Sequence, residues 1–112
     1  MLKSIKLLLL LLLLIATAIP AAAKTVTLAW DASSSAEIEN YKVYYRTDTP
    51  TFPFNGTNLS EGASPIVVNG STFSLAIDLP EDGSIYYFTT TASNNTGLES
   101  IFSNIVASEC NV

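Results

Sequence analysis

Residues 73–79 read FSLAIDL, and every second position in this stretch is a large apolar residue. Successive side chains of a β-strand point to opposite faces, so this period of two predicts a strand with one buried face. The turn residues Pro80-Glu81-Asp82-Gly83 follow at once and end the strand. Comparable strand patterns occur at residues 26–30, 38–46, 66–68, 86–92 and 102–108, and no window from residue 24 onward has helical periodicity. Short strands separated by turns predict an all-β fold, a two-sheet antiparallel β-sandwich.

Composition excludes several classes of function. The chain has 112 residues, no histidine and one cysteine, so it holds one domain and lacks Ser-His-Asp, Cys-His and cysteine-zinc sites. We therefore expect no catalysis, no cofactor and no metal. The formal net charge of −5 would repel phosphates, so we expect no nucleic acid as a partner.

The N-terminal segment predicts export. Lys3 and Lys6 precede the apolar run Leu7–Ile15, and the small residues Ala21-Ala22-Ala23 follow. This order is typical of a secretory signal peptide over residues 1–23, which leaves a domain over residues 24–112. We expect a secreted, extracellular or periplasmic protein, with the cell surface as an alternative. A retained segment would instead anchor the domain, and only then would the membrane be a partner.

The order and spacing of several motifs resemble a fibronectin type III domain, which has an immunoglobulin-like sandwich. The resemblance covers Thr25 to Ser108 and rests on VTLAWD at 26–31, YKVYY at 41–45, Leu79-Pro80, Tyr86 before FTTTA at 88–92, and GLES at 97–100 with Ser103-Asn104. It implies that Trp30 packs between the sheets. It also implies that Tyr86 is the corner tyrosine, with its hydroxyl bonded to backbone near residues 79–81. The expected core contains Trp30, Tyr41, Val43, Leu79, Tyr86 and Phe88.

The resemblance also indicates that the first strand of the family is missing or reduced. A chain that begins at Lys24 starts at the second strand, and the strand at residues 26–30 then has an uncovered edge. A partner or a second copy could donate a strand to this edge. Alternatively, twist, Lys24 and the threonines protect it.

Aromatic residues are the strongest candidates for a binding surface. Tyr44 and Tyr87 are expected on the outer face of one sheet, as a platform for a ligand or as a cross-strand pair that stabilises the sheet. Phe52 and Phe54 lie in a long loop and could form contacts or cap the core. Loop contacts could also come from the turn at Asn94, Asn95 and Thr96, although no Arg-Gly-Asp adhesion motif is present.

Two further features have alternative interpretations. Cys110 could form an intermolecular disulfide or serve as a small apolar side chain. Asp78, Glu81 and Asp82 are interpreted as solvated turn residues rather than as calcium ligands or an acid-base pair.

The leading functional hypothesis is a secreted or cell-surface binding and adhesion module. It would make noncovalent contacts with an extracellular protein or polysaccharide. The alternative is a structural subunit that self-associates through the open sheet edge or through Cys110.

Overall fold

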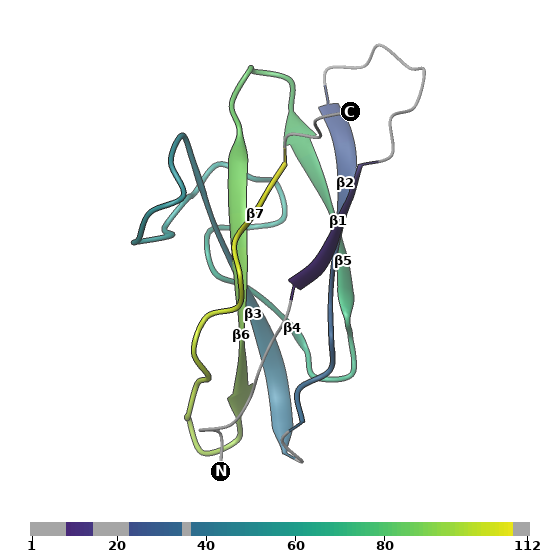
Figure 1. Ribbon diagram of the computed structural model, residues 1–112, viewed down its shortest axis with the longest axis vertical. Helices are drawn as coiled ribbons and strands as arrows, with labels where there is room; N and C mark the ends of the chain where they lie inside the picture. The colour runs from purple at the N-terminus through teal and green to yellow at the C-terminus, as the bar shows by residue number, and fades with distance from the viewer. Residues whose placement is uncertain (1–8, 15–22, 35–36, 109–112) are drawn as a thin grey trace.

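The computed structural model describes residues 9–14, 23–34 and 37–108 and confirms an all-β sandwich of two antiparallel sheets (Figure 1). No helix in the described part of the chain is long and apolar enough to cross a membrane. One sheet has the order β1-β2-β5, and the other has the order β4-β3-β6-β7. The strands are β1 (Leu9–Leu14), β2 (Ala23–Trp30), β3 (Ile38–Thr47), β4 (Ile66–Asn69), β5 (Ser74–Pro80), β6 (Tyr86–Asn94) and β7 (Val106–Ala107).

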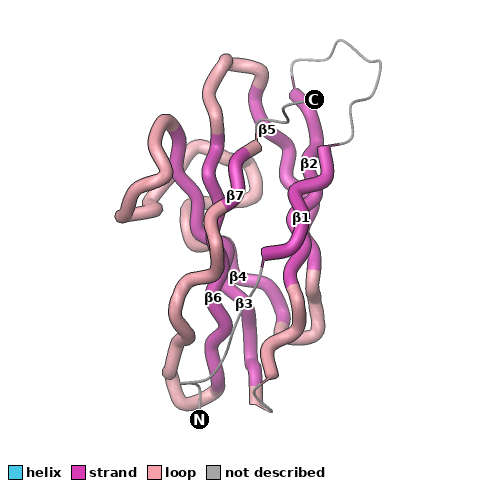
Figure 2. The backbone as a smooth tube through the Cα atoms, in the orientation of Figure 1, coloured by secondary structure: helices cyan, strands magenta, loops and turns pink. Residues whose placement is uncertain are grey.

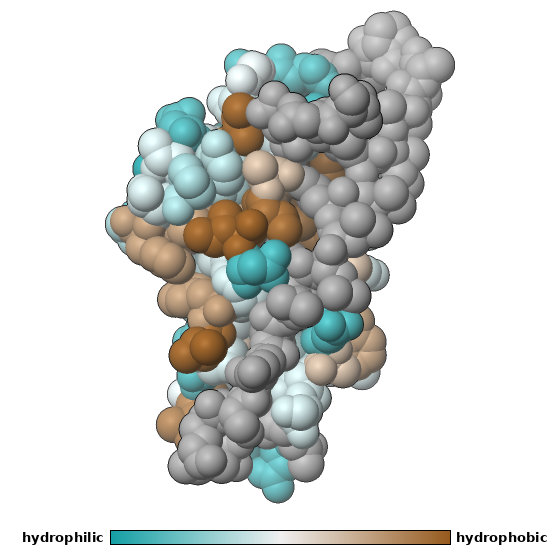
Figure 3. Space-filling view, in the orientation of Figure 1, coloured by the Kyte–Doolittle hydropathy of each residue, from teal (hydrophilic) through white to brown (hydrophobic). Residues whose placement is uncertain are grey.

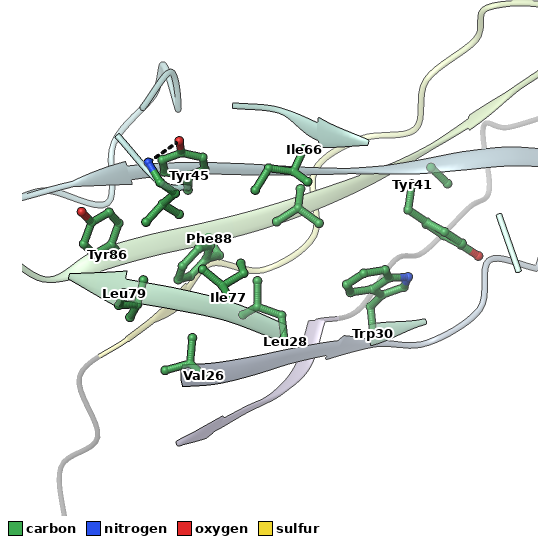
Figure 4. Close-up of a cluster of buried hydrophobic side chains, with 13 residues drawn as sticks. Val26, Leu28, Trp30, Tyr41, Tyr45, Ile66, Ile77, Leu79, Tyr86 and Phe88 are labelled. Carbon is green, nitrogen blue, oxygen red and sulfur yellow. Dashed lines mark hydrogen bonds between the residues drawn. The ribbon is translucent and has the colours of Figure 1, made fainter. Parts of the chain in front are cut away.

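The core forms where the alternating apolar residues of the two sheets face each other (Figure 4). The six expected core residues, Trp30, Tyr41, Val43, Leu79, Tyr86 and Phe88, are all buried. Trp30 packs against Tyr41 with ring centroids 5.6 Å apart. Phe73, expected to point inward, is instead 42% exposed, because it lies just before β5 begins. Its ring contacts Tyr41 edge-on.

A strand from the predicted signal segment covers the outer edge of β2. Leu9–Leu14 forms β1 and pairs antiparallel with β2 from Val26 to Trp30. The expectation of an uncovered edge concerns a chain from which residues 1–23 have been removed. In the 112-residue chain this edge of β2 is paired.

The final strand is much shorter than the expected 102–108, and serine hydroxyls take over part of its pairing. The N–H groups of Ser100, Ser103 and Ser108 donate to the carbonyls of Ala92, Thr90 and Tyr86 on β6. Each serine hydroxyl also accepts a hydrogen bond from the N–H of the same β6 residue, at 2.9 Å in all three pairs. The segment therefore stays beside β6 at these three serines and through the short strand β7, and the rest of its backbone is irregular (Figure 2).

The long loop between β3 and β4 is attached to the core by tyrosine hydroxyls. The Tyr45 hydroxyl donates to the Gly62 carbonyl at 2.6 Å and accepts from the Leu59 N–H at 3.2 Å. The Tyr86 hydroxyl is paired with the Asn58 side-chain amide. The expected corner bond from Tyr86 to backbone near residues 79–81 is therefore wrong, because this loop folds over the end of the sandwich and supplies the partner.

Candidate functional site

Four aromatic side chains from three separate segments form a continuous cluster at the surface. Tyr44 comes from β3, Phe52 and Phe54 from the long loop, and Phe102 from the segment before β7. Ring centroids lie 5.0 Å apart for Tyr44 and Phe102, 4.7 Å for Phe102 and Phe52, and 4.8 Å for Phe52 and Phe54. We call these four residues the aromatic cluster.

The outer members of the aromatic cluster are open to solvent. Phe52 is 53% exposed and Phe102 is 40% exposed, whereas Phe54 is buried beneath them. Ile101, next to Phe102 in the chain, is 73% exposed. Apolar side chains gather on this face over the segment before β7 and the neighbouring long loop (Figure 3). Contiguous exposed apolar area of this kind is a recognised mark of interaction surfaces.

The serine pairing positions the exposed part of this surface. Ser100 and Ser103 are each held on β6 by a backbone and a side-chain hydrogen bond. Only Ile101 and Phe102 lie between these two anchors, and both remain exposed. The backbone that carries Phe102 is therefore fixed at both ends.

A polar network holds the Tyr44 side chain beside Phe102. The Tyr44 hydroxyl donates to the Glu99 carboxylate, which also accepts from the Thr91 hydroxyl at 2.6 Å. Lys42 Nζ lies 3.7 Å from Glu99 Oε1. The pKa of Tyr44 is raised to about 12. Desolvation by burial has the largest effect, and the hydrogen bond to Glu99 and the negative charge of Glu99 add to it.

Burial and polar contacts shift the pKa of Glu99 in opposite directions. Partial burial raises the pKa of this carboxyl, but the hydrogen bonds from Thr91 and Tyr44 and the charge of Lys42 together lower it below its ordinary value. Glu99 is thus charged at neutral pH and fixes the Tyr44 hydroxyl, so that the ring stays against Phe102.

Tyr87 shares the outer face with Tyr44 but is not directly opposite it. Tyr44 pairs with Thr89, and Arg46 pairs with Tyr87. The two tyrosines are therefore diagonal neighbours, and the ring contact of Tyr44 that the structure places on this face is to Phe102. Phe52 and Phe54 divide between the two roles considered for them, since Phe52 is exposed and Phe54 is buried.

The turn at residues 94–97 has an internal organisation of its own. The Asn94 side-chain carbonyl accepts from the N–H groups of Thr96 and Leu98, each at 3.0 Å, and from the Thr96 hydroxyl at 2.8 Å. Asn94 therefore shapes the turn, while Asn95 and Thr96 remain exposed.

The remaining candidates contribute nothing to the aromatic cluster. Asp78 accepts from the Thr25 hydroxyl at 2.7 Å, across the β2–β5 pair. Among the residues that the structure describes, no group of three or more His, Cys, Asp or Glu side chains could hold a metal ion. Cys110 lies outside the described residues.

Phe102, Ile101 and Glu99 are the functional candidates that the sequence pattern did not single out. Phe102 was expected only as the start of a last strand. The sequence feature that indicates how this segment is held is the set of serines at 100, 103 and 108, because serine hydroxyls can replace backbone acceptors beside a strand.

Comparison with known proteins supports the fold and goes no further. No family model and no curated protein matches the chain. Nine chains of solved structures match, among them one described as "Myokine structure", with a TM-score of 0.51 and 15% identity over 94% of this chain and 89% of that chain. A likeness at this identity shows a shared β-sandwich fold.

Proposed function

We propose that this protein is an exported, noncatalytic binding module of the fibronectin type III kind, which uses the aromatic cluster to bind apolar side chains of an extracellular protein. The observation that carries the proposal is the contact chain from Tyr44 through Phe102 to Phe52, in which the last two rings are exposed. Motif order and the sandwich fold support the family part of the proposal.

The ring geometry favours a protein ligand over a polysaccharide. Interplanar angles along the cluster are 73° for Tyr44 and Phe102, 51° for Phe102 and Phe52, and 59° for Phe52 and Phe54. A sugar ring stacks best on a flat aromatic face, which inclined rings do not provide together. The inclined rings form a ridged apolar surface, and branched aliphatic side chains fit between such ridges.

Preorganisation further supports a binding role. The backbone around Phe102 is anchored at Ser100 and Ser103, and Tyr44 is held by Glu99. A surface that is already ordered before binding loses less conformational entropy on association. Burial of the exposed part of one phenylalanine ring contributes about 1 kcal/mol or more to binding at ordinary transfer coefficients.

Peptide display against the processed protein, run beside a panel of immobilised polysaccharides, tests the proposal. We expect selected peptides to be rich in aliphatic and aromatic residues. Their binding should be lost in the double variant Phe52→Ser with Phe102→Ser, and retained in Phe73→Ser. Phe73 is a matched control because it is also a phenylalanine, is 42% exposed, and contacts Tyr41 ahead of β5 rather than a member of the cluster.

Two outcomes would contradict the proposal. One is binding to polysaccharide alone. The other is peptide binding that the double variant and the control variant retain equally while both remain folded.

A further inference from the structure

The outer edge of β2 pairs with β1, a strand that the predicted processing would remove. In the 112-residue chain, Leu11 and Leu13 of β1 pair with Ala29 and Thr27 of β2. The whole of β1 lies within the segment that the sequence predicts to be a signal peptide. Removal of residues 1–23 would take this strand away and leave β2 paired with β5 alone.

The backbone groups that lose their partners can be identified. The Trp30 N–H donates to the Phe73 carbonyl at 3.1 Å, which places the hydrogen-bonding groups of Trp30 on the β5 side. Hydrogen-bonding direction alternates along a strand, so those of Thr27 and Ala29 point to the β1 side. Loss of β1 therefore leaves the N–H and C=O groups of Thr27 and Ala29 without a strand partner.

Between Lys24 and Asp31, this edge lacks the usual protection against pairing. Residues 25–30 read TVTLAW and contain no charged residue, proline or glycine. Natural edge strands are commonly blunted by lysine, proline or a bulge. The two-stranded remnant β2–β5 would also be a marginal sheet by itself.

We propose that, once residues 1–23 are removed, the β2 strands of two copies pair antiparallel and form one continuous sheet in the order β5-β2-β2-β5. The proposal rests on the predicted export rather than on the aromatic cluster. An antiparallel two-fold pairing satisfies the freed groups of both copies at once, because each copy presents the same edge.

The charge pattern fits a second copy as the occupant. Lys24 and Asp31 flank the uncharged stretch at its two ends and are both exposed. Antiparallel overlap brings the Lys24 end of one copy to the Asp31 end of the other, so opposite charges meet at both ends. A parallel overlap would instead place like charges together, which disfavours it.

The buried faces restrict the register. Val26, Leu28 and Trp30 point into the core. A two-fold axis at Leu28 keeps both apolar faces on one side of the continuous sheet, because Val26 then lies opposite Trp30 of the second copy. Thr27 lies opposite Ala29 of the second copy in this register.

The test starts from the 112-residue sequence expressed in a secreting host, with the processed mass confirmed before analysis. Sedimentation in reductant, which excludes a Cys110 disulfide, should show a dimer that dissociates on dilution. Thr27→Pro should weaken this dimer at least about tenfold, because one edge N–H is lost from each copy. Thr27→Val is the matched control and should leave the dimer intact, since it keeps the backbone donor.

A second measurement keeps the test valid if the proline variant does not fold. In a Cys110→Ser background, Thr27→Cys mixed with Ala29→Cys should give a disulfide-linked heterodimer, since opposed residues lie within disulfide reach. A processed protein that stays monomeric at all concentrations would overturn the proposal. So would retention of residues 1–23, a dimer that a folded Thr27→Pro variant leaves unchanged, or failure of the cysteine pair to link. The Phe52 and Phe102 variants should remain dimeric, so this proposal and the proposed binding function can fail separately.

Discussion

Replacement of Ser103 by alanine tests the serine pairing that positions Phe102. The Thr90 N–H donates to the Ser103 hydroxyl at 2.9 Å, and Thr90 is fully buried. Alanine removes this acceptor without offering another, so a buried N–H group loses its partner. An unsatisfied buried donor costs about 1–3 kcal/mol. For a domain of this size, a loss of about 2 kcal/mol lowers the melting temperature by roughly 8 to 16 °C.

Urea unfolding followed by Trp30 fluorescence provides the assay, with Ser60→Ala as the matched control. Ser60 is an exposed serine of the long loop, and its replacement should change the free energy of unfolding by less than about 0.5 kcal/mol. Equal stability of the two variants would refute the argument that the Ser103 hydroxyl replaces a backbone acceptor of the sheet.

Three further predictions concern the core, the long loop and the polar network. Trp30→Ala should cost about 3–5 kcal/mol in urea unfolding, because the indole is buried between the sheets; a loss below about 1 kcal/mol would exclude this placement. Gly56→Ala should cost about 1–3 kcal/mol in the same assay, because the new Cβ would lie 2.5 Å from the buried Tyr45 ring; unchanged stability would contradict that contact. Tyrosinate absorbance should show Tyr44 titrating near pH 12 and, in Glu99→Gln, closer to its ordinary value of 10.0; an unchanged titration would argue against the coupling.

The same network sets the direction of two pH effects on stability. Folding lowers the pKa of Glu99, so its contribution is present above the unfolded pKa and is lost as pH falls through the folded one. Folding raises the pKa of Tyr44, so its contribution is present below 10.0 and is lost as pH rises through about 12. Chemical denaturation at several pH values, with Glu99→Gln for comparison, measures both effects.

Strand positions and the core were predictable because burial imposes a period of two. The alternation at residues 73–79 and at the other strands identified the buried side of each sheet, and the six expected core residues are buried. Pairing by serine hydroxyls leaves no such period, so the sequence of residues 102–108 does not show where regular strand pairing begins. Within this stretch only Val106–Ala107 has strand pairing.

Loop placement was not predictable for a related reason. The partners of the Tyr45 and Tyr86 hydroxyls lie 14 or more positions away along the chain, in a loop without a repeating pattern. The sequence singled out Tyr44 and Phe52 separately. Contact between their segments through Phe102 depends on tertiary structure, so the aromatic cluster as a unit could not be derived from spacing.

The most direct test of the central claim is an NMR titration of the processed, isotope-labelled protein with a peptide selected by display. The account predicts that aromatic resonances of Phe52, Phe102 and Tyr44 shift together as peptide is added, while those of Phe73 on the other side of the core stay unchanged. Saturable shifts confined to residues outside the aromatic cluster would contradict it.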